Sequence, residues 1–420
     1  MFVAYSVFLR LFNRDNNVIM KILHTADWHL GKRLEQYERK KEHELFLNWL
    51  VDEIDKQKAD VLIVAGDVFD SGNPSNKTLK LYYDFLGRLK NTGCKKAIIV
   101  GGNHDSASML DAPRDILGLF DISVKGALSD NIEESVVTVK DDAGNIGLVV
   151  CAVPFLRDKD IRLSVSGETV EEQERRIKQG IMNKYAELIP HIASRKEKGI
   201  PVIATGHLFT AGSQAASDER EIYVGNLGRV DANKFPREFD YIALGHLHKF
   251  QKAGNSGRIF YSGSPFAMSF AESNHKKYVL ATEFEGGKLK SVDPIEIPVF
   301  RKLIRIKGSV DDFRDIVRKN KLNDKELPSW IEFTTESDDD NLQSELNDIT
   351  EGTTVEATFL RRTKIGGTGD VSEPQVSLSD LSPASVFEMS FSAKVPENEF
   401  AELVQTFNEA LELFREKNTD

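Results

Sequence analysis

Short apolar runs of this chain end in residues whose side chains can bind a metal ion. The runs at residues 60–68 ("DVLIVAGDV") and 240–246 ("DYIALGH") are apolar over most of their length, as expected for strands buried on both faces of a sheet. Helical patterns lie between such runs, at residues 42–57 and 170–195. Comparable runs occupy residues 21–27, 95–102, 145–155 and 201–207. This alternation predicts a layered α/β fold with helices outside the sheets.

The polar residues at the ends of these runs are candidate ligands of one shared site, because sites in α/β sheets form at the carboxyl ends of strands. His246 and His248 are two residues apart, and such positions project to the same side of an extended chain. Isolated histidines such as His24 and His43 are interpreted as structural or solvated. The seven candidate metal ligands are Asp27, His29, Asp67, Asn103, His207, His246 and His248.

The ligand types indicate which metal the site would hold. Imidazole, carboxylate and amide oxygen without thiolate suit Mn²⁺, Fe²⁺ or Zn²⁺. Seven ligands exceed the needs of one ion and suffice for two, and a shared Asp67 would hold two ions roughly 4 Å apart. Asp27 and Asp67 would cancel only two of four positive charges, which leaves charge for a hydroxide and one phosphodiester oxygen.

The order of these motifs, "DWH", "GD", "GNHD", "GH" and "GHLH", resembles that of the calcineurin-like metallophosphoesterases over about residues 20–284. The segments "ILHTADWHLGKRL", "AGDVFDSGNPS" and "ALGHLHKFQ" look more specifically like the bacterial SbcD family, which is related to the Mre–Rad type of repair nuclease. The resemblance implies a four-layer αββα metallophosphoesterase sandwich. It also implies a small α+β capping domain after the sandwich, and a C-terminal helix.

The resemblance also implies roles for single residues. His104 would be the catalytic histidine, and Asp105 would orient it. Archaeal and eukaryotic relatives carry a second histidine where this chain has Asp70, so the role of that histidine cannot be transferred. One Mn²⁺ would be held by Asp27, His29, Asp67 and His248, and the other by Asp67, Asn103, His207 and His246.

Five segments are predicted along the chain. After Pro298 the pattern changes to strands and helices of a compact α+β module, followed by a Gly-, Ser- and Pro-rich stretch. The first residues lack the basic start and cleavage site of an export signal. The segments are a disordered N-terminal extension (1–19), the nuclease domain (20–298), the capping domain (299–365), a linker (366–383) and a partner-docking segment (384–420).

Charge leaves room for a nucleic-acid partner. The net charge of −11 argues against a generally basic coat, but it does not exclude a local basic cleft. Lys32 and Arg33 directly follow the first ligand pair and are the predicted DNA contacts. Arg39, Lys40 and Lys41 are either further DNA contacts or a solvated helix start.

Cysteine use and hydropathy bear on the compartment. No apolar run is long enough to cross a membrane. The two cysteines, Cys94 and Cys151, lack metal-ligand spacing and are expected to be reduced, which favours the cytoplasm.

Three classes of function are compatible with the sequence. The resemblance favours a Mn²⁺-dependent DNA nuclease subunit of recombination and repair, with 3′–5′ exonuclease activity on double strands and endonuclease activity on single strands and hairpins. Its partners would be DNA and an SbcC-type coiled-coil ATPase, in a heterotetramer that contains a homodimer of this chain. A phosphoesterase of a small nucleotide is the alternative, and a scaffold with a relic site is disfavoured because every ligand position is filled.

Two segments keep open interpretations. Residues 207–230 form either the rim of the site or a simple connection. The C-terminal apolar stripe either docks on the ATPase or packs in the core of this chain. The stripe consists of Phe400, Leu403, Val404, Phe407, Leu411 and Phe414.

Overall fold

A computed structural model describes residues 19–161, 169–211, 213, 229–321, 327–363, 387, 403, 404, 406 and 407. The chain divides into two compact units, Met1–Thr334 with Asp339–Arg361, and Thr335–Asp338 with Arg362–Asp420. The predicted linker, residues 1–18, most of the loop at 207–230, and Phe400, Leu411 and Phe414 of the C-terminal stripe lie outside the described residues. Both six-stranded sheets and the α+β module belong largely to the first unit.

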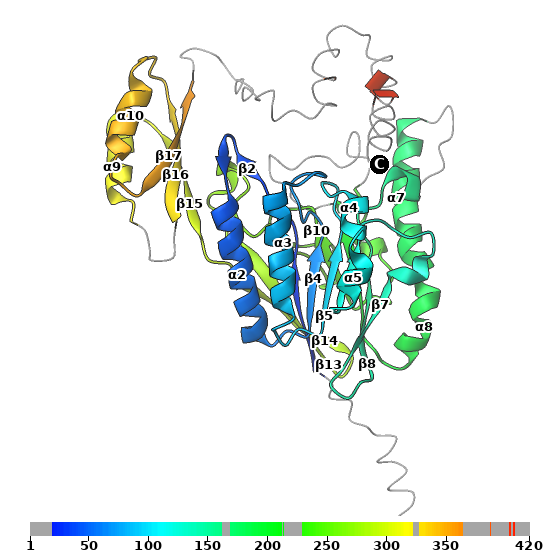
Figure 1. The fold of residues 1–420 in the computed structure, drawn as a ribbon. Coiled ribbons are helices and arrows are strands. Elements are labelled where there is room, and N and C mark those ends of the chain that lie inside the picture. The colour runs from blue at the N-terminus through cyan, green and yellow to red at the C-terminus, as the bar shows by residue number, and fades with distance from the viewer. Residues whose placement is uncertain are drawn as a thin grey trace, which may run out of the picture. The chain divides into compact units, whose positions relative to one another are not determined.

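The first sheet has the strand order β14-β13-β1-β4-β5-β6 (Figure 1). Strands β1, β4, β5 and β6 are parallel, whereas β13 and β14 are antiparallel additions at one edge. All five residues of β4 are buried, as a run without polar alternation requires. The strands are β1 (Ile19–Thr25), β4 (Val61–Ala65), β5 (Lys96–Val100), β6 (Ile122–Lys125), β13 (Tyr278–Glu285) and β14 (Lys288–Glu296).

Helices α2 (Lys40–Gln57) and α3 (Asn76–Leu89) cover the outer face of this sheet (Figure 1). Their buried side chains, including Leu50 and Phe85, share a core with Leu62 of β4. Two short helices, α4 (Ala107–Asp111) and α5 (Arg114–Gly118), lead from β5 into β6.

The second sheet has the order β11-β12-β10-β9-β8-β7. Helices α7 (Val170–Glu187) and α8 (Ile189–Glu197) cover its outer face through side chains such as Tyr185 and Ile192. One helix was expected at residues 170–195, but the helix divides at Leu188, because Pro190 in the first turn of α8 has no N–H to continue the preceding helix. The strands are β7 (Val136–Lys140), β8 (Ile146–Cys151), β9 (Val202–His207), β10 (Tyr241–Gly245), β11 (Gln251–Lys252) and β12 (Ile259–Tyr261).

The two sheets share one apolar core between them. Ile63 and Ile98 of the first sheet lie in the same cluster as Val150, Ile203 and Ala243 of the second. The layers are therefore helices, sheet, sheet and helices, and the predicted αββα sandwich is confirmed.

The small α+β module follows the sandwich. Its sheet has the order β15-β16-β17, and a cluster that includes Phe313, Phe333 and Leu346 joins the sheet to its helices. Ser309 begins α9 with a capping box that it forms with Asp312. The elements are β15 (Arg301–Lys307), α9 (Val310–Lys319), β16 (Leu327–Thr335), α10 (Leu342–Thr350) and β17 (Val355–Arg362). The exact domain boundaries stay a prediction.

A cluster of buried charges, here called the junction, joins this module to α2. It consists of Arg39, Glu42 and Arg301, and Arg39 is only 2% exposed. Arg39 Nε donates to Glu42 Oε1 at 2.9 Å, and Arg301 Nε donates to Glu42 Oε2 at 3.1 Å. The interpretation of Arg39 as a DNA contact is therefore wrong, because its guanidinium is buried over the Phe266 ring.

The remaining short elements lie near the strand ends. A hairpin of β2 (Arg33–Leu34) and β3 (Tyr37–Glu38) follows the first ligand pair. The others are α6 (Asp158–Ile161) and the 3₁₀ turns η1 (Ile132–Ser135), η3 (Ala232–Lys234) and η4 (Phe270–Glu272). Within the described ranges, no helix is both long and apolar enough to cross a membrane.

Candidate metal centre

The structure brings all seven candidate ligands into one cluster at the carboxyl ends of β1, β4, β5, β9 and β10. Ligand atoms of Asp27, Asp67 and His207 lie within 4.8 Å of one another. Asn103 Oδ1 lies 2.9 Å from His207 Nε2, which adds the amide to this group. A pocket of about 310 Å³ is lined by further predicted residues, among them His29, His104, His246 and His248.

Four of the candidate ligands hold backbone conformations that L-residues rarely adopt. The φ angles are 54° at Asp27, 44° at His29, 49° at Asp67 and 100° at His246. Strain of this kind gathers at functional sites, where the surrounding structure maintains it. Here the Asp27 N–H donates to Gly66 O and the His29 N–H to Asp67 O, both at 3.0 Å, so the loops after β1 and β4 hold each other.

The expectation that His246 and His248 project from extended backbone is wrong. Strand β10 ends at Gly245, and the φ of 100° at His246 breaks the alternation of an extended chain. Both imidazoles still line the same pocket, because the turn carries them there.

Two glycines allow the ligand loops to approach closely. A Cβ on Gly66, whose φ is 92°, would lie 2.2 Å from His207 Nδ1, and one on Gly102 would lie 2.1 Å from Asp67 Oδ1. Any side chain at either position would displace a candidate ligand.

The Asp67 carboxylate lies between His207 and His29. Its Oδ2 is 3.2 Å from His207 Nε2 and 3.6 Å from His29 Nε2. Its Oδ1 accepts the His104 N–H at 2.9 Å, which ties the loop after β5 to the same carboxylate. This is the position that a bridging carboxylate needs.

The nitrogen and oxygen atoms of the candidate ligands are arranged in a way that suits metal cations. His207 Nδ1 lies 3.0 Å from Ala65 O, and since a carbonyl only accepts, Nδ1 carries the proton. If the ring is neutral, its Nε2 presents a lone pair toward Asn103 Oδ1 and Asp67 Oδ2, so that either a proton on Nε2 or a metal ion is needed between these three acceptors. Buried Asp27 Oδ2, His29 Nε2 and His246 Nε2 have no hydrogen-bond partner among the described residues. Converging acceptors and unpaired buried atoms are the arrangement that divalent ions would complete.

Burial and neighbouring charges shift the pKa values of these groups in both directions. Burial lowers the pKa of His29 to about 4 and that of His246 well below its usual range, so both candidate ligands are neutral at pH 7. Burial also lowers the pKa of His207, but Asp67 and Asp27 outweigh it and raise that pKa to about 9. Burial raises the pKa of the Asp27 carboxyl to about 6. The site therefore attracts positive charge, whether a proton or a metal ion.

His104 and Asp105 do not form the pair that was expected. The Asp105 carboxylate accepts the N–H groups of Val68 at 3.1 Å, Phe69 at 2.9 Å and Gly102 at 2.8 Å. The His104 ring instead donates from Nδ1 to Asp70 O at 2.9 Å. Asp105 thus holds the loops after β4 and β5 together and acts on His104 only through the backbone.

Two carboxylates beside the ligands had no role in the sequence interpretation. Asp70 Oδ1 lies 3.2 Å from His29 Nδ1 and 3.2 Å from Lys32 Nζ. Glu272 Oε1 lies 3.2 Å from His248 Nδ1. Asp70 is visible in the "GDVFD" segment, whereas Glu272 lies in η4 and carries no motif signal.

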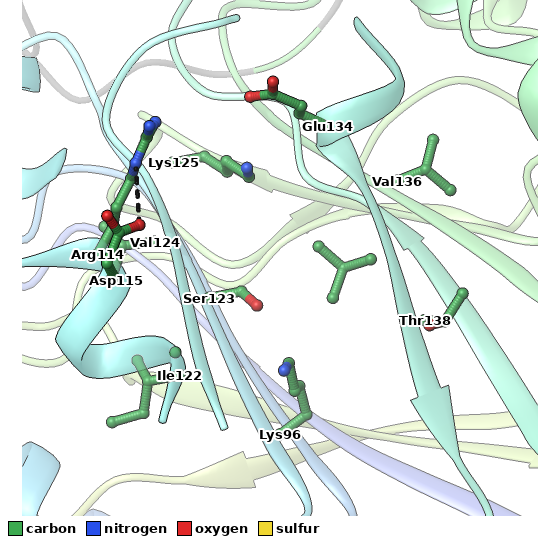
Figure 2. A pocket seen from close by; sticks show the side chains of 12 residues that line it. Lys96, Arg114, Asp115, Ile122, Ser123, Val124, Lys125, Glu134, Val136 and Thr138 are labelled. Atoms are coloured by element: carbon green, nitrogen blue, oxygen red, sulfur yellow. Dashed lines mark ion pairs between the residues drawn. The ribbon is translucent and has the colours of Figure 1, made fainter. Parts of the chain in front are cut away.

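The predicted DNA contacts lie at the rim of the pocket. Lys32 and Arg33 both line it, and Arg33 is paired with Glu38 at 3.5 Å on the exposed hairpin. A second hollow of about 490 Å³ opens between β6 and β7 (Figure 2). Its Lys96, Lys125 and Arg114 are largely offset by Asp115 and Glu134, and it contains none of the candidate ligands.

Comparisons with known proteins agree with this geometry. Residues 20–250 match the family described as calcineurin-like phosphoesterase, and residues 299–395 match the type 5 capsule protein repressor C-terminal domain. The chain is 36% identical to the SbcD component of the nuclease SbcCD of Escherichia coli (strain K12), over 88% of this chain and 92% of that protein. It is 35% identical to the SbcD component of Rhodobacter capsulatus, over 67% of this chain and 70% of that protein. For the SbcD component of Bacillus subtilis (strain 168) the identity is 31%, over 69% and 73%.

Proposed function

Because the chain belongs to the calcineurin-like phosphoesterase family and, within it, to the SbcD nuclease components, we propose that it cleaves DNA at a centre of two divalent metal ions. The chain is a hydrolase of phosphodiester bonds, and the DNA substrate and Mn²⁺ as the ion belong to the proposal. The observation that supports it most is the proximity of the seven candidate ligands, three of which have buried atoms without a hydrogen-bond partner among the described residues.

The proposed ligand sets follow the family pattern. The His29–His248 site consists of Asp27, His29, Asp67 and His248, and the His207–His246 site consists of Asp67, Asn103, His207 and His246. When bound, the ions supply Lewis-acid polarisation of the phosphate and a water of lowered pKa. The position of Asp67 between His29 and His207 supports its assignment as the shared ligand.

His104 is proposed as the catalytic histidine. Its Nδ1 donates to Asp70 O, so the ring is oriented by backbone and its Nε2 remains for the substrate. In its doubly protonated form, a ring held in this way can donate a hydrogen bond from Nε2 to the leaving oxygen as negative charge develops there. Asp105 is proposed as a positioning residue, which holds the His104 loop against the loop after β4.

Lys32 and Arg33 are the proposed contacts to the DNA backbone. Both are at the pocket rim, and their side chains are 27% and 52% exposed, so they can reach phosphates without leaving a buried position. Contacts of this kind bind DNA without reading its sequence.

The proposal extends to partners and compartment. Names of the relatives describe one component of the nuclease SbcCD, which supports an SbcC-type coiled-coil ATPase as partner in DNA recombination and repair. The match at residues 299–395 supports a capping domain with part of the docking segment. A homodimer within a heterotetramer and a cytoplasmic location complete the proposal.

The test is a nuclease assay on linear and hairpin DNA, with Mn²⁺ or Mg²⁺, and with or without the ATPase. We expect cleavage that depends on Mn²⁺, and we expect Asp67→Ala to abolish both metal binding and cleavage. Cleavage of a small cyclic nucleotide or nucleotide pyrophosphate, with DNA left intact, would instead support the alternative phosphoesterase.

A further inference from the structure

Two of the candidate histidines contact a carboxylate through Nδ1, and in His29 the other ring nitrogen, Nε2, faces Asp67. His29 Nδ1 lies 3.2 Å from Asp70 Oδ1, which is close enough for an ion pair although the two atoms do not meet the geometry of a hydrogen bond. His248 Nδ1 lies 3.2 Å from Glu272 Oε1. Both histidines belong to the proposed His29–His248 site.

The other site has a different support. His207 Nδ1 donates to the backbone carbonyl of Ala65 at 3.0 Å, and its neighbour Asn103 is a neutral ligand. A carbonyl fixes the ring tautomer as a carboxylate does, but it brings no negative charge. The two sites therefore differ in the charge of the group that contacts the histidine Nδ1.

We propose that Asp70 and Glu272 are positioning residues that make the His29–His248 site the tighter of the two metal sites. The inference rests on the proposed function, since it uses its ligand sets. A carboxylate at Nδ1 keeps the proton there, points the Nε2 lone pair at the ion, and adds negative charge behind the ring.

Glu272 is held too firmly to turn away from His248. It is 1% exposed, and its Oε2 accepts the Met268 N–H at 3.2 Å and pairs with the Lys277 ammonium. Lys277 Nζ also donates to Ser264 Oγ at 2.8 Å and to His248 O at 3.1 Å. The Glu272 carboxylate, and not the Lys277 ammonium, faces the His248 ring, so the ring lies next to a negative charge.

Asp70 is the more adaptable of the two. Its side chain is 30% exposed, and one oxygen, Oδ1, is shared between His29 Nδ1 and Lys32 Nζ. A phosphate that draws Lys32 away would leave this oxygen to His29 alone. Asp70 thus links a proposed DNA contact to a proposed metal ligand.

The test is a titration of the full-length chain with Mn²⁺, in which the electron paramagnetic resonance signal of the free ion reports binding. We expect two phases for the unchanged chain. Asp70→Asn and Glu272→Gln should each weaken the tighter phase by about tenfold or more and change the weaker phase by less than about twofold. The control is Glu53→Gln, which neutralises a buried carboxylate that pairs with Lys56 near the C-terminal end of α2.

The outcomes separate this inference from the proposed function. If both phases weaken equally, or neither does, the inference is wrong while the metal centre stands. If the unchanged chain binds fewer than two ions, the proposed function itself is wrong. Thermal unfolding of the metal-free variants shows whether each variant still folds. Glu272→Gln could fail to fold because Lys277 would lose its counter-charge. In that case the Mn²⁺ titration of Asp70→Asn alone tests the inference.

Discussion

The junction and the metal centre are two clusters of buried polar side chains, and they are built in opposite ways. In the junction, Glu42 receives both Arg39 and Arg301, and Arg301 also lies over the Trp330 ring at 4.2 Å. In the metal centre, Asp27 Oδ2, His29 Nε2 and His246 Nε2 are buried without any hydrogen-bond partner among the described residues.

The difference separates structural from functional burial. An unpaired buried polar atom costs about 1–3 kcal/mol, so a cluster of them persists only where a ligand completes it. A paired cluster such as the junction needs nothing further. If this distinction holds, changes in the metal centre should alter chemistry with little effect on folding, and changes in the junction should do the reverse.

The largest expected effect is that of His104→Ala. Cleavage of linear DNA should fall by about 10²–10⁴-fold, the usual contribution of an acid–base side chain. Binding of two Mn²⁺ ions should persist, because His104 is outside the proposed ligand sets. A drop in the number of bound ions would place His104 among the ligands, where its proximity to His29 and Asp70 would allow it to act.

Glu42→Gln tests the junction. Two buried arginines would lose their shared counter-charge, and the free energy of unfolding should decrease by about 3–5 kcal/mol, measured by chemical denaturation. Glu44→Gln is the matched control on the same helix, since Glu44 pairs with Lys40 at the exposed surface and should contribute about 1 kcal/mol or less. A change in Mn²⁺ affinity in Glu42→Gln would contradict the separation of the two clusters.

His24 gives a smaller effect that depends on pH. Burial lowers its pKa to about 3, and its ring contacts Tyr241 Oη at 2.9 Å and Leu244 O at 3.2 Å, so it belongs with the paired groups. Below its ordinary pKa of about 6.5 the unfolded chain binds a proton that the folded chain does not, so stability falls as the pH drops toward 3.

The slope from this one residue is at most about 1.4 kcal/mol per pH unit. Denaturation of the metal-free chain should show a shallower acid slope in His24→Gln than in the unchanged chain. Equal slopes would mean that His24 is not the group that takes up the proton.

Lys32→Ala should have the smallest effect of these variants. Lys32 belongs neither to the paired cluster nor to the unpaired one, because it is paired with Asp70 and is partly exposed at the pocket rim. DNA binding should weaken uniformly across sequences, and the salt dependence should lose about one unit of slope. Fluorescence anisotropy at several salt concentrations measures both, and an unchanged slope would remove Lys32 from the DNA contacts.

Sequence reasoning succeeded where chemistry and strand order coincide. Asp67 and His207 follow apolar runs, and the carboxyl ends of those strands meet, so their proximity could be predicted without coordinates. The two sheets and the helices on their outer faces followed from the same alternation.

The sequence did not predict the contacts that depend on three-dimensional packing. Arg39 has the sequence of a solvated helix start, and only the approach of Phe266 and Arg301 buries it. Glu272 reaches His248 from a turn that no motif marks. His246 departs from the strand pattern because β10 ends one residue earlier.

The conformation of Asp27 has a consequence for laboratory evolution of this chain. Its φ of 54° suits asparagine better than aspartate, and its buried Oδ2 would cost less as a neutral amide. A library screened for heat tolerance alone should therefore enrich Asp27→Asn, a variant that lacks one of the proposed metal-binding carboxylates. Selection for a more stable enzyme must therefore measure catalytic activity in the same round. Otherwise it will select proteins that are stable but inactive.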